Sequence, residues 1–155
     1  MPRADGMGIK GMSVRRRLLL IATGLVLLFI FVQSLLPQSV SADESSWLTE
    51  KILDPIAFFF GLGPVSHQIV RKLAHIFEFA VLSVLLTLIC RGKAVKSFGF
   101  GFLFAFLDES VQLLSDRGAQ LSDVWIDLIG VALGTLLGLL LWKAIRSQRF
   151  DTQTR

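Results

Sequence analysis

The chain has 155 residues, of which 53% are hydrophobic and 18% are charged, and its mean hydropathy is +0.65. Soluble domains carry about 25% charged residues, so these values exclude an ordinary soluble domain and predict a small membrane protein. The net charge of +4 does not indicate nucleic-acid binding, because the Lys and Arg residues flank apolar stretches, as topology signals do. Cys90 is the only cysteine, which excludes an internal disulfide and a Cys-x-x-Cys site.

Four apolar stretches are long enough to cross a hydrocarbon core of about 30 Å, which takes about 20 helical residues. They cover residues 18–36, 72–90, 97–114 and 122–142. In the third stretch, every second residue from Phe98 to Phe106 is Phe, a period typical of a strand. A single strand in lipid would leave its backbone groups without partners, so a helix is favoured. The predicted fold class is an all-α membrane protein with four transmembrane helices.

Basic residues mark one side of all four predicted spans. They precede the first span, fill the loop between the second and third, and follow the fourth: Arg15, Arg16, Arg17, Arg91, Lys93, Lys96, Lys143, Arg146, Arg149 and Arg155. By the positive-inside rule, this pattern predicts a multi-pass cell-membrane protein with both termini in the cytoplasm. The predicted organisation is a basic N-terminus at 1–17, a four-helix transmembrane domain at 18–142 and a basic tail at 143–155.

An alternative treats residues 1–42 as a cleaved signal peptide, because Val40, Ser41 and Ala42 have the small-residue spacing of a cleavage site. The orientation of the other three spans is the same in both cases, because the basic loop at 91–96 fixes it.

The first extracytoplasmic loop contains a further helical pattern. Trp47, Leu48, Ile52 and Leu53 recur at helical spacing with charged residues between them, which predicts an amphipathic interfacial helix at 46–57. It is interpreted as a surface anchor, with a lid over the polar residues described next as the alternative. The Phe residues at 58–60, before Gly61, indicate a short dip into the bilayer.

Ionisable and amide side chains gather near the extracytoplasmic ends of the last three spans. An Asp, Lys or Arg in a membrane helix costs about 2.5–3.5 kcal/mol on insertion scales, so such residues usually face the bundle interior and mark function. With a rise of about 1.5 Å per residue, the carboxylates of the three helices reach a similar depth. The candidate cluster consists of Lys72, His75, Glu78, Asp108, Glu109, Gln112, Arg117, Asp123 and Asp127.

Two interpretations of this cluster stay open. It is either a polar network that holds the helices in register or a hydrated pocket open to the outside. The number of polar residues favours the pocket, because a network that only joins helices needs one or two per helix.

Gly130, Gly134 and Gly138 form two successive GxxxG steps in the last span, which predicts close approach of another helix. The third span, with Gly99 and Gly101, is a candidate partner. A homodimer through the same glycines is the alternative.

The stretch KLAHIFEF at 72–79, followed by DESVQLLSDRGAQLSDVWIDLIGVALG at 108–134, resembles the VanZ-like membrane protein family. The resemblance covers about residues 30–142, with Phe79 where the family usually has Tyr and Asp127 where it usually has Asn. It implies a bacterial envelope protein, and the namesake of the family is associated with low-level resistance to the glycopeptide antibiotic teicoplanin.

Three hypotheses for function follow. The first is an envelope protein whose polar pocket binds a lipid-linked ligand, and the alternative is a membrane-embedded enzyme that uses the Glu, Asp and His side chains for acid–base chemistry. The third, a metal site around His75, is weakened by the lack of a second suitable His, so no metal and no cofactor are predicted. The sequence contains no Walker loop, dinucleotide fingerprint or GxSxG elbow.

Overall fold

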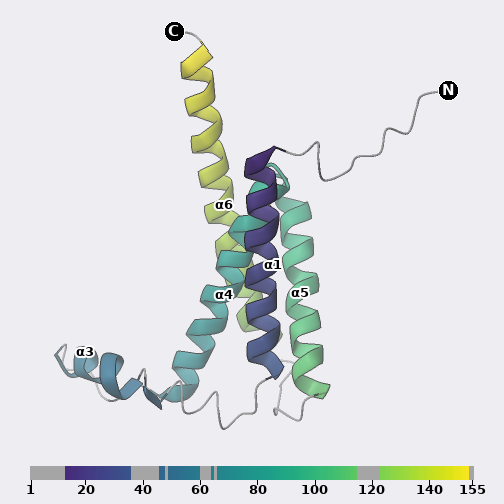
Figure 1. The fold of residues 1–155 in the computed structure, drawn as a ribbon. Coiled ribbons are helices and arrows are strands. Elements are labelled where there is room, and N and C mark those ends of the chain that lie inside the picture. The colour runs from purple at the N-terminus through teal and green to yellow at the C-terminus, as the bar shows by residue number, and fades with distance from the viewer. Residues whose placement is uncertain are drawn as a thin grey trace.

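The computed structural model describes residues 13–35, 46–47, 49–59, 64, 66–114 and 123–153. Every regular element in this part of the chain is helical, so the all-α prediction is confirmed there. Four long helices form an upright bundle (Figure 1). They are α1 (Val14–Leu35), α4 (His67–Ile89), α5 (Ala94–Leu114) and α6 (Asp123–Gln153).

Three of these helices are long and apolar enough to cross a membrane, over Val14–Leu35, Ile69–Ile89 and Asp123–Gln148. The sequence predicted four such helices, and the difference lies in α5. Lys96, Asp108 and Glu109 reduce its hydropathy, because three charges fall within 21 residues. Its length of about 32 Å nevertheless matches that of a spanning helix.

The turn between α4 and α5 is fixed by two residues in the left-handed region of the backbone, Arg91 with φ 55° and Gly92 with φ 74°. The amide of Gly92 donates to the carbonyl of Thr87 at 2.9 Å, which satisfies a carbonyl at the end of α4. A β-carbon on Gly92 would overlap the indole of Trp142, so this turn packs directly against α6.

The glycine face of α6 packs against α4. β-Carbons added at Gly130 and Gly134 would overlap the backbone of Ile76 and Ala80, and one at Gly138 would overlap the side chain of Thr87. The prediction of a partner within the chain is confirmed, but the helix is α4 rather than the third predicted span. Because α4 fills this face, the glycines are not available for a homodimer.

The other helices assemble around the α4–α6 pair. Helix α5 contacts both α4 and α6, and α1 contacts α4 and α5. At Gly101, α5 approaches Val131 and Ser83 closely. The apolar core is small, as expected for a bundle whose outer face contacts lipid, and consists of Ile30, Phe79, Leu82, Leu86, Ala105 and Val131.

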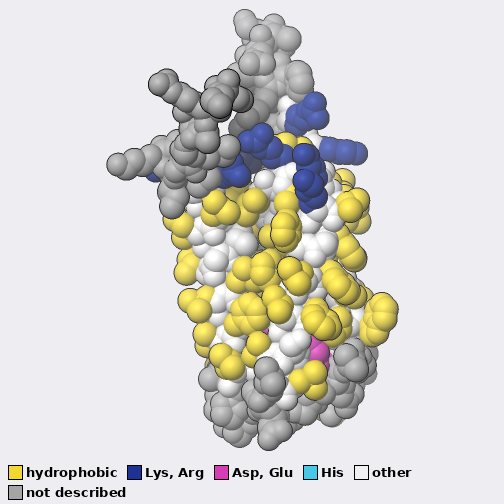
Figure 2. Space-filling model, turned by 90° about the vertical axis from the view of Figure 1, so that its right-hand side faces the viewer, with side chains coloured by type: hydrophobic (Ala, Val, Ile, Leu, Met, Phe, Trp, Pro, Cys, Tyr) yellow, Lys and Arg dark blue, Asp and Glu magenta, His cyan; other side chains and the backbone are white. Residues whose placement is uncertain are grey.

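Large apolar side chains cover the outside of the bundle, and Lys and Arg form a band at one end (Figure 2). This distribution matches a bilayer around the helices and an aqueous interface at the basic end. Helix α6 continues past Trp142 to Gln153, beyond the predicted end of the fourth span, and projects at this end (Figure 1).

The region between α1 and α4 is helical over Thr49–Leu53, a π-helical turn labelled η2, and over α3 (Asp54–Phe59). It extends sideways from the bundle at the end opposite the start of α1 and the end of α6 (Figure 1). Phe58 and Phe59 are 83% and 82% exposed, as an apolar surface directed at lipid would be. An amphipathic interfacial helix remains a prediction, and Leu48, Phe60 and Gly61, on which the anchor, lid and dip hypotheses also depend, lie outside the described residues.

Candidate polar site

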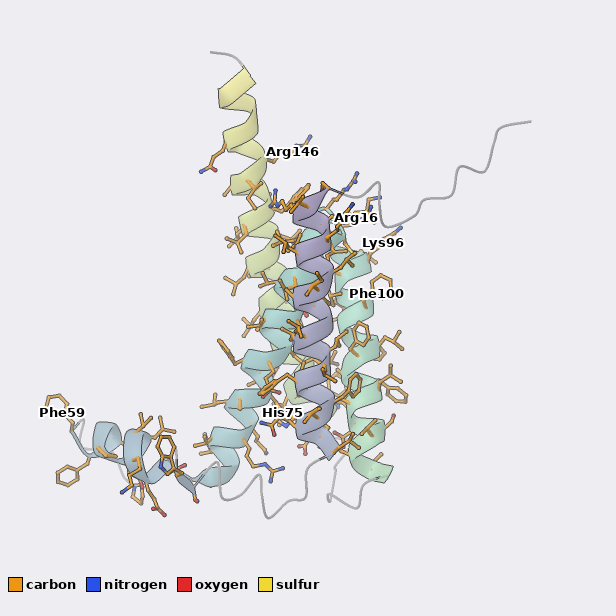
Figure 3. All side chains as sticks on the ribbon, viewed as in Figure 1. Arg16, Phe59, His75, Lys96, Phe100 and Arg146 are labelled. Carbon is orange, nitrogen blue, oxygen red and sulfur yellow. The ribbon has the colours of Figure 1, made fainter. Side chains whose placement is uncertain are left out.

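The polar cluster lies at the end of the bundle opposite the basic residues. His75 lies near the lower end of the helices, whereas Arg16, Lys96 and Arg146 lie near the upper end (Figure 3). These positions agree with the predicted arrangement, in which the basic residues and the polar cluster lie at opposite ends of the spans. The side of the membrane on which each end lies stays a prediction.

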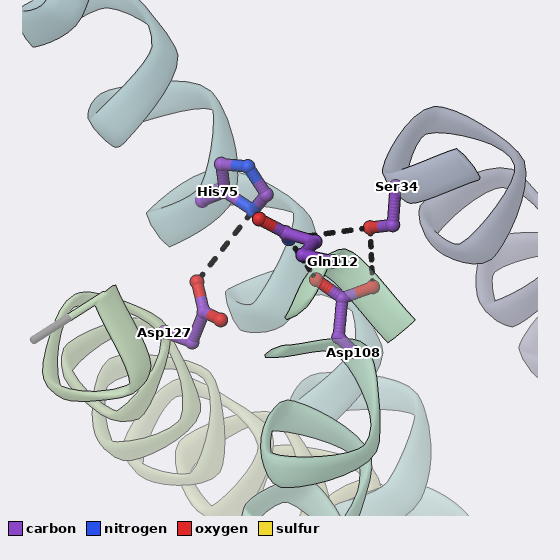
Figure 4. Close-up of polar contacts among 5 residues, drawn as sticks. All are labelled: Ser34, His75, Asp108, Gln112 and Asp127. Carbon is purple, nitrogen blue, oxygen red and sulfur yellow. Dashed lines mark hydrogen bonds and ion pairs between the residues drawn. The ribbon is translucent and has the colours of Figure 1, made fainter. Parts of the chain in front are cut away.

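Asp108 is fully buried and is held by two hydrogen bonds (Figure 4). The hydroxyl of Ser34, on α1, donates to Oδ1 at 2.5 Å, and the amide of Gln112 donates to Oδ2 at 2.7 Å. The same amide lies 3.3 Å from the Ser34 hydroxyl. Asp108 and Gln112 are four residues apart on α5, the spacing that places two side chains on one helix face.

His75 of α4 faces Asp127 of α6, with Nδ1 3.6 Å from Oδ1 (Figure 4). The side chain of His75 is 24% exposed and that of Asp127 is 3% exposed. Helix packing sets this register, because Gly130 touches the backbone of Ile76, the residue next to His75. Asp127 lies three residues before Gly130 and therefore comes opposite His75.

Asp108 and its hydrogen-bond partners lie next to the pair formed by His75 and Asp127. One ligand atom from each of His75, Asp108 and Asp127 can be chosen so that all three lie within 4.8 Å of one another. With Ser34, all four long helices contribute a polar side chain to this point. Within the part of the chain that the structure describes, these three side chains form the group that could hold a metal ion.

Glu109 differs from its neighbour Asp108. It is 2% exposed, yet neither carboxylate oxygen accepts a hydrogen bond from any residue that the structure describes. It interacts electrostatically with Asp108 and Asp123. A buried carboxylate without hydrogen-bond donors is stabilised when it binds a proton or lies next to a cation.

The remaining predicted members are more peripheral. Lys72 is exposed, and Glu78 and Asp123 are partly buried. Arg117 lies outside the described residues. The sequence placed nine residues in one cluster. The structure buries four of them, Asp108, Glu109, Gln112 and Asp127, and places the partly exposed His75 beside Asp127.

The sequence analysis missed Ser34 as a member of the site. Serine is common in membrane helices, so composition gives it little weight. A usable signal was its position in the last turn of the first span, at the same end as the acidic residues.

The chemistry of the buried part is dominated by acceptors. Three carboxylates with little exposure lie together with one imidazole, one amide and one hydroxyl. Such a set suits a proton, a metal cation or the donor groups of a ligand.

Neither the curated proteins nor the solved structures gave a match. The VanZ/LLP1 family model matches residues 19–143, which run from within α1 through α4 and α5 to Lys143 of α6. The chain belongs to the VanZ/LLP1 family.

Proposed function

We propose that this protein crosses the bacterial cell membrane four times and binds the polar headgroup of a lipid-linked envelope ligand at the polar end of its bundle. Binding there would lower the access of teicoplanin to its membrane-bound target. The observation that carries the proposal is the convergence of polar side chains from α1, α4, α5 and α6 on one point.

The depth of the cluster supports a headgroup as ligand. Ser34 lies in the last turn of α1, Gln112 near the end of α5 and Asp127 near the start of α6. At about 1.5 Å per residue, these three positions lie within about 6 Å of the helix ends and Asp108 lies about 9 Å from the end of α5, so the cluster begins where hydrocarbon gives way to headgroups.

A ligand would reach the cluster along the exposed side of α4. Asp108 is completely buried, but His75 is partly exposed and Lys72, one turn before it, is exposed. Residues three apart on a helix are surface neighbours. Lys72 and His75 therefore offer two potential cationic donors to a phosphate that approaches from the headgroup layer.

Resistance is tested by expression in a teicoplanin-susceptible Gram-positive strain. We expect the wild-type protein to raise the minimum inhibitory concentration of teicoplanin, and Lys72→Gln and His75→Gln to abolish the increase at equal abundance. Lys51→Gln, which changes an exposed lysine of η2, is the matched control and should retain resistance. Resistance that survives both site variants would exclude this site.

Headgroup binding is tested with purified protein in nanodiscs that contain either undecaprenyl phosphate or phosphatidylglycerol. Native mass spectrometry should show retained undecaprenyl phosphate on the wild type and loss of it in Lys72→Gln. Equal retention of both lipids by the wild type would contradict a lipid-linked ligand.

Topology is tested with single cysteines in a Cys90→Ser background. Cysteines that replace Ser45 and Gln120 should react with an impermeant thiol reagent on whole cells, and one that replaces Ser147 should not. Labelling at position 147 would contradict the four-span arrangement with cytoplasmic termini. The mass of the mature protein, which should include Leu18 to Val32, tests the cleaved-signal alternative.

A further inference from the structure

We infer that His75, Asp108 and Asp127 form a binding site for one divalent transition-metal cation, Mn²⁺ or Zn²⁺, at the junction of α4, α5 and α6. The inference goes beyond the proposed function and does not depend on headgroup binding. It also departs from the expectation drawn from the sequence, where the presence of a single suitable His argued against a metal.

The spacing of the ligand atoms fits one ion. Two ligands at about 2.1 Å from a metal are about 3.0 Å apart at a right angle and about 4.2 Å apart across it. His75 Nδ1 and Asp127 Oδ1 are 3.6 Å apart, inside this span and longer than a hydrogen bond. All three ligand atoms lie within 4.8 Å of one another, so small side-chain rotations place them on one ion.

The surrounding charge provides a second and independent argument. Asp108, Glu109 and Asp127 are each exposed by 2% or less, and ionised carboxylates lose much of their hydration in such a place. Asp127 interacts electrostatically with both Asp108 and Glu109, so the three groups share one region. Glu109, whose oxygens accept no hydrogen bond from the described residues, adds negative potential beside the ligand atoms.

The hydrogen bonds around Asp108 suit a metal ligand. One of its oxygens accepts a hydrogen bond from Ser34 and the other accepts one from Gln112, and a carboxylate oxygen can accept more than one contact. Outer contacts of this kind fix the orientation of a ligating carboxylate. The carboxylate is therefore held in place for coordination.

One imidazole nitrogen and two carboxylates as ligands favour a particular class of metal. Ca²⁺ and Mg²⁺ favour oxygen ligands alone, whereas Mn²⁺ and Zn²⁺ accept imidazole together with carboxylates. Three protein ligands leave at least one coordination position for water or for an anionic oxygen of a ligand.

The test uses the full-length protein in detergent, stripped with EDTA and titrated with MnCl₂. We expect one saturable Mn²⁺ per chain by electron paramagnetic resonance, displaced by ZnCl₂. Pulsed measurements should show ¹⁴N coupling from one imidazole. The wild-type titration decides the matter without any variant: no saturable binding of either metal would overturn the inference, even if variants fail to fold.

Variants then locate the site. His75→Gln should remove the ¹⁴N coupling, whereas His67→Gln, which changes the other histidine of the chain, should keep it. Asp127→Asn should weaken Mn²⁺ binding more than tenfold, and Ser34→Ala, which removes an outer contact, by about tenfold. Glu50→Gln, an exposed carboxylate of η2, should leave the affinity unchanged. Coupling that persists in His75→Gln would place the metal elsewhere and overturn the inference.

Discussion

The middle and the polar end of the bundle are held together by different means. In the middle, α4 and α6 touch through glycines, and Gly130 and Gly134 rest on the backbone of Ile76 and Ala80. At the polar end, the same two helices face each other through His75 and Asp127, whose nearest charged atoms are 3.6 Å apart. The close backbone packing of α4 against α6 therefore ends near Gly130, and the ionisable side chains lie beyond it, toward the polar end.

This difference bears on what the polar residues do. Helices in lipid associate through close packing of small residues, and hydrogen bonds between them add about 0.6 kcal/mol on average. The glycine face already provides the close packing between α4 and α6. The polar end is therefore not required to join these two helices, which supports the proposal that it has a role other than packing.

The largest loss of stability should come from the middle of the bundle. Gly134→Leu would force side-chain atoms into the backbone of Ala80, and overpacking against a fixed neighbour costs about 1–3 kcal/mol or more. We expect a clear fall in melting temperature and in membrane abundance. Gly24→Leu is the control, because no atom lies within 4 Å of a β-carbon at this exposed position of α1. Equal loss in both variants would show that the α4–α6 contact is not specific.

A smaller loss is expected from Asp108→Asn. The new amide oxygen can still accept from Gln112 and the new amide nitrogen can donate to the Ser34 hydroxyl, but the hydrogen bonds lose the strength that a charged acceptor gives them, at a cost of about 1–2 kcal/mol. Thermal melts in detergent measure the change, with Glu50→Gln as an exposed control. A loss larger than that of Gly134→Leu would reverse the comparison and identify the polar network as the main support of the bundle.

The helices could be predicted from sequence to within a few residues at most ends, because apolar length and flanking charge are local properties. The helix that packs against the glycine face could not be predicted. Gly130 and Gly134 indicate that another helix comes close, but they do not indicate which helix it is. The sequence predicted four spans, whereas three of the described helices are apolar enough to cross a membrane, because Asp108 and Glu109 lower the hydropathy of α5 whether they face lipid or the interior.

The residues of the site could be predicted where their side chains have a high free energy of insertion into a membrane. Asp108, Glu109 and Asp127 stand out for this reason, and all three are buried. Ser34 carries no such signal, because a hydroxyl costs little, and its role appears only when α1 is placed beside α5. The exposure of Lys72 could not be predicted either. The sequence places Lys72 on the polar side of its helix, but it does not show which part of that side contacts another helix.

The smallest loss of stability is expected from Ser34→Ala. It removes the hydroxyl that donates to Asp108 Oδ1 while Gln112 still holds Oδ2, so we expect about 0.5–1 kcal/mol. Ser110→Ala is the matched control, because the Ser110 hydroxyl donates to the carbonyl of Phe106 in its own helix. Identical melts of the two variants would indicate that the α1–α5 hydrogen bond adds no stability.

Glu109→Gln tests most directly whether the polar end binds a ligand or supports the fold. The Glu109 oxygens accept no hydrogen bond from the described residues, and the side chain lies among other carboxylates. Removal of its charge should leave the melting temperature equal or higher while teicoplanin resistance is lost. A fall of several degrees with full resistance at normal abundance would contradict a binding role and show that Glu109 serves the fold.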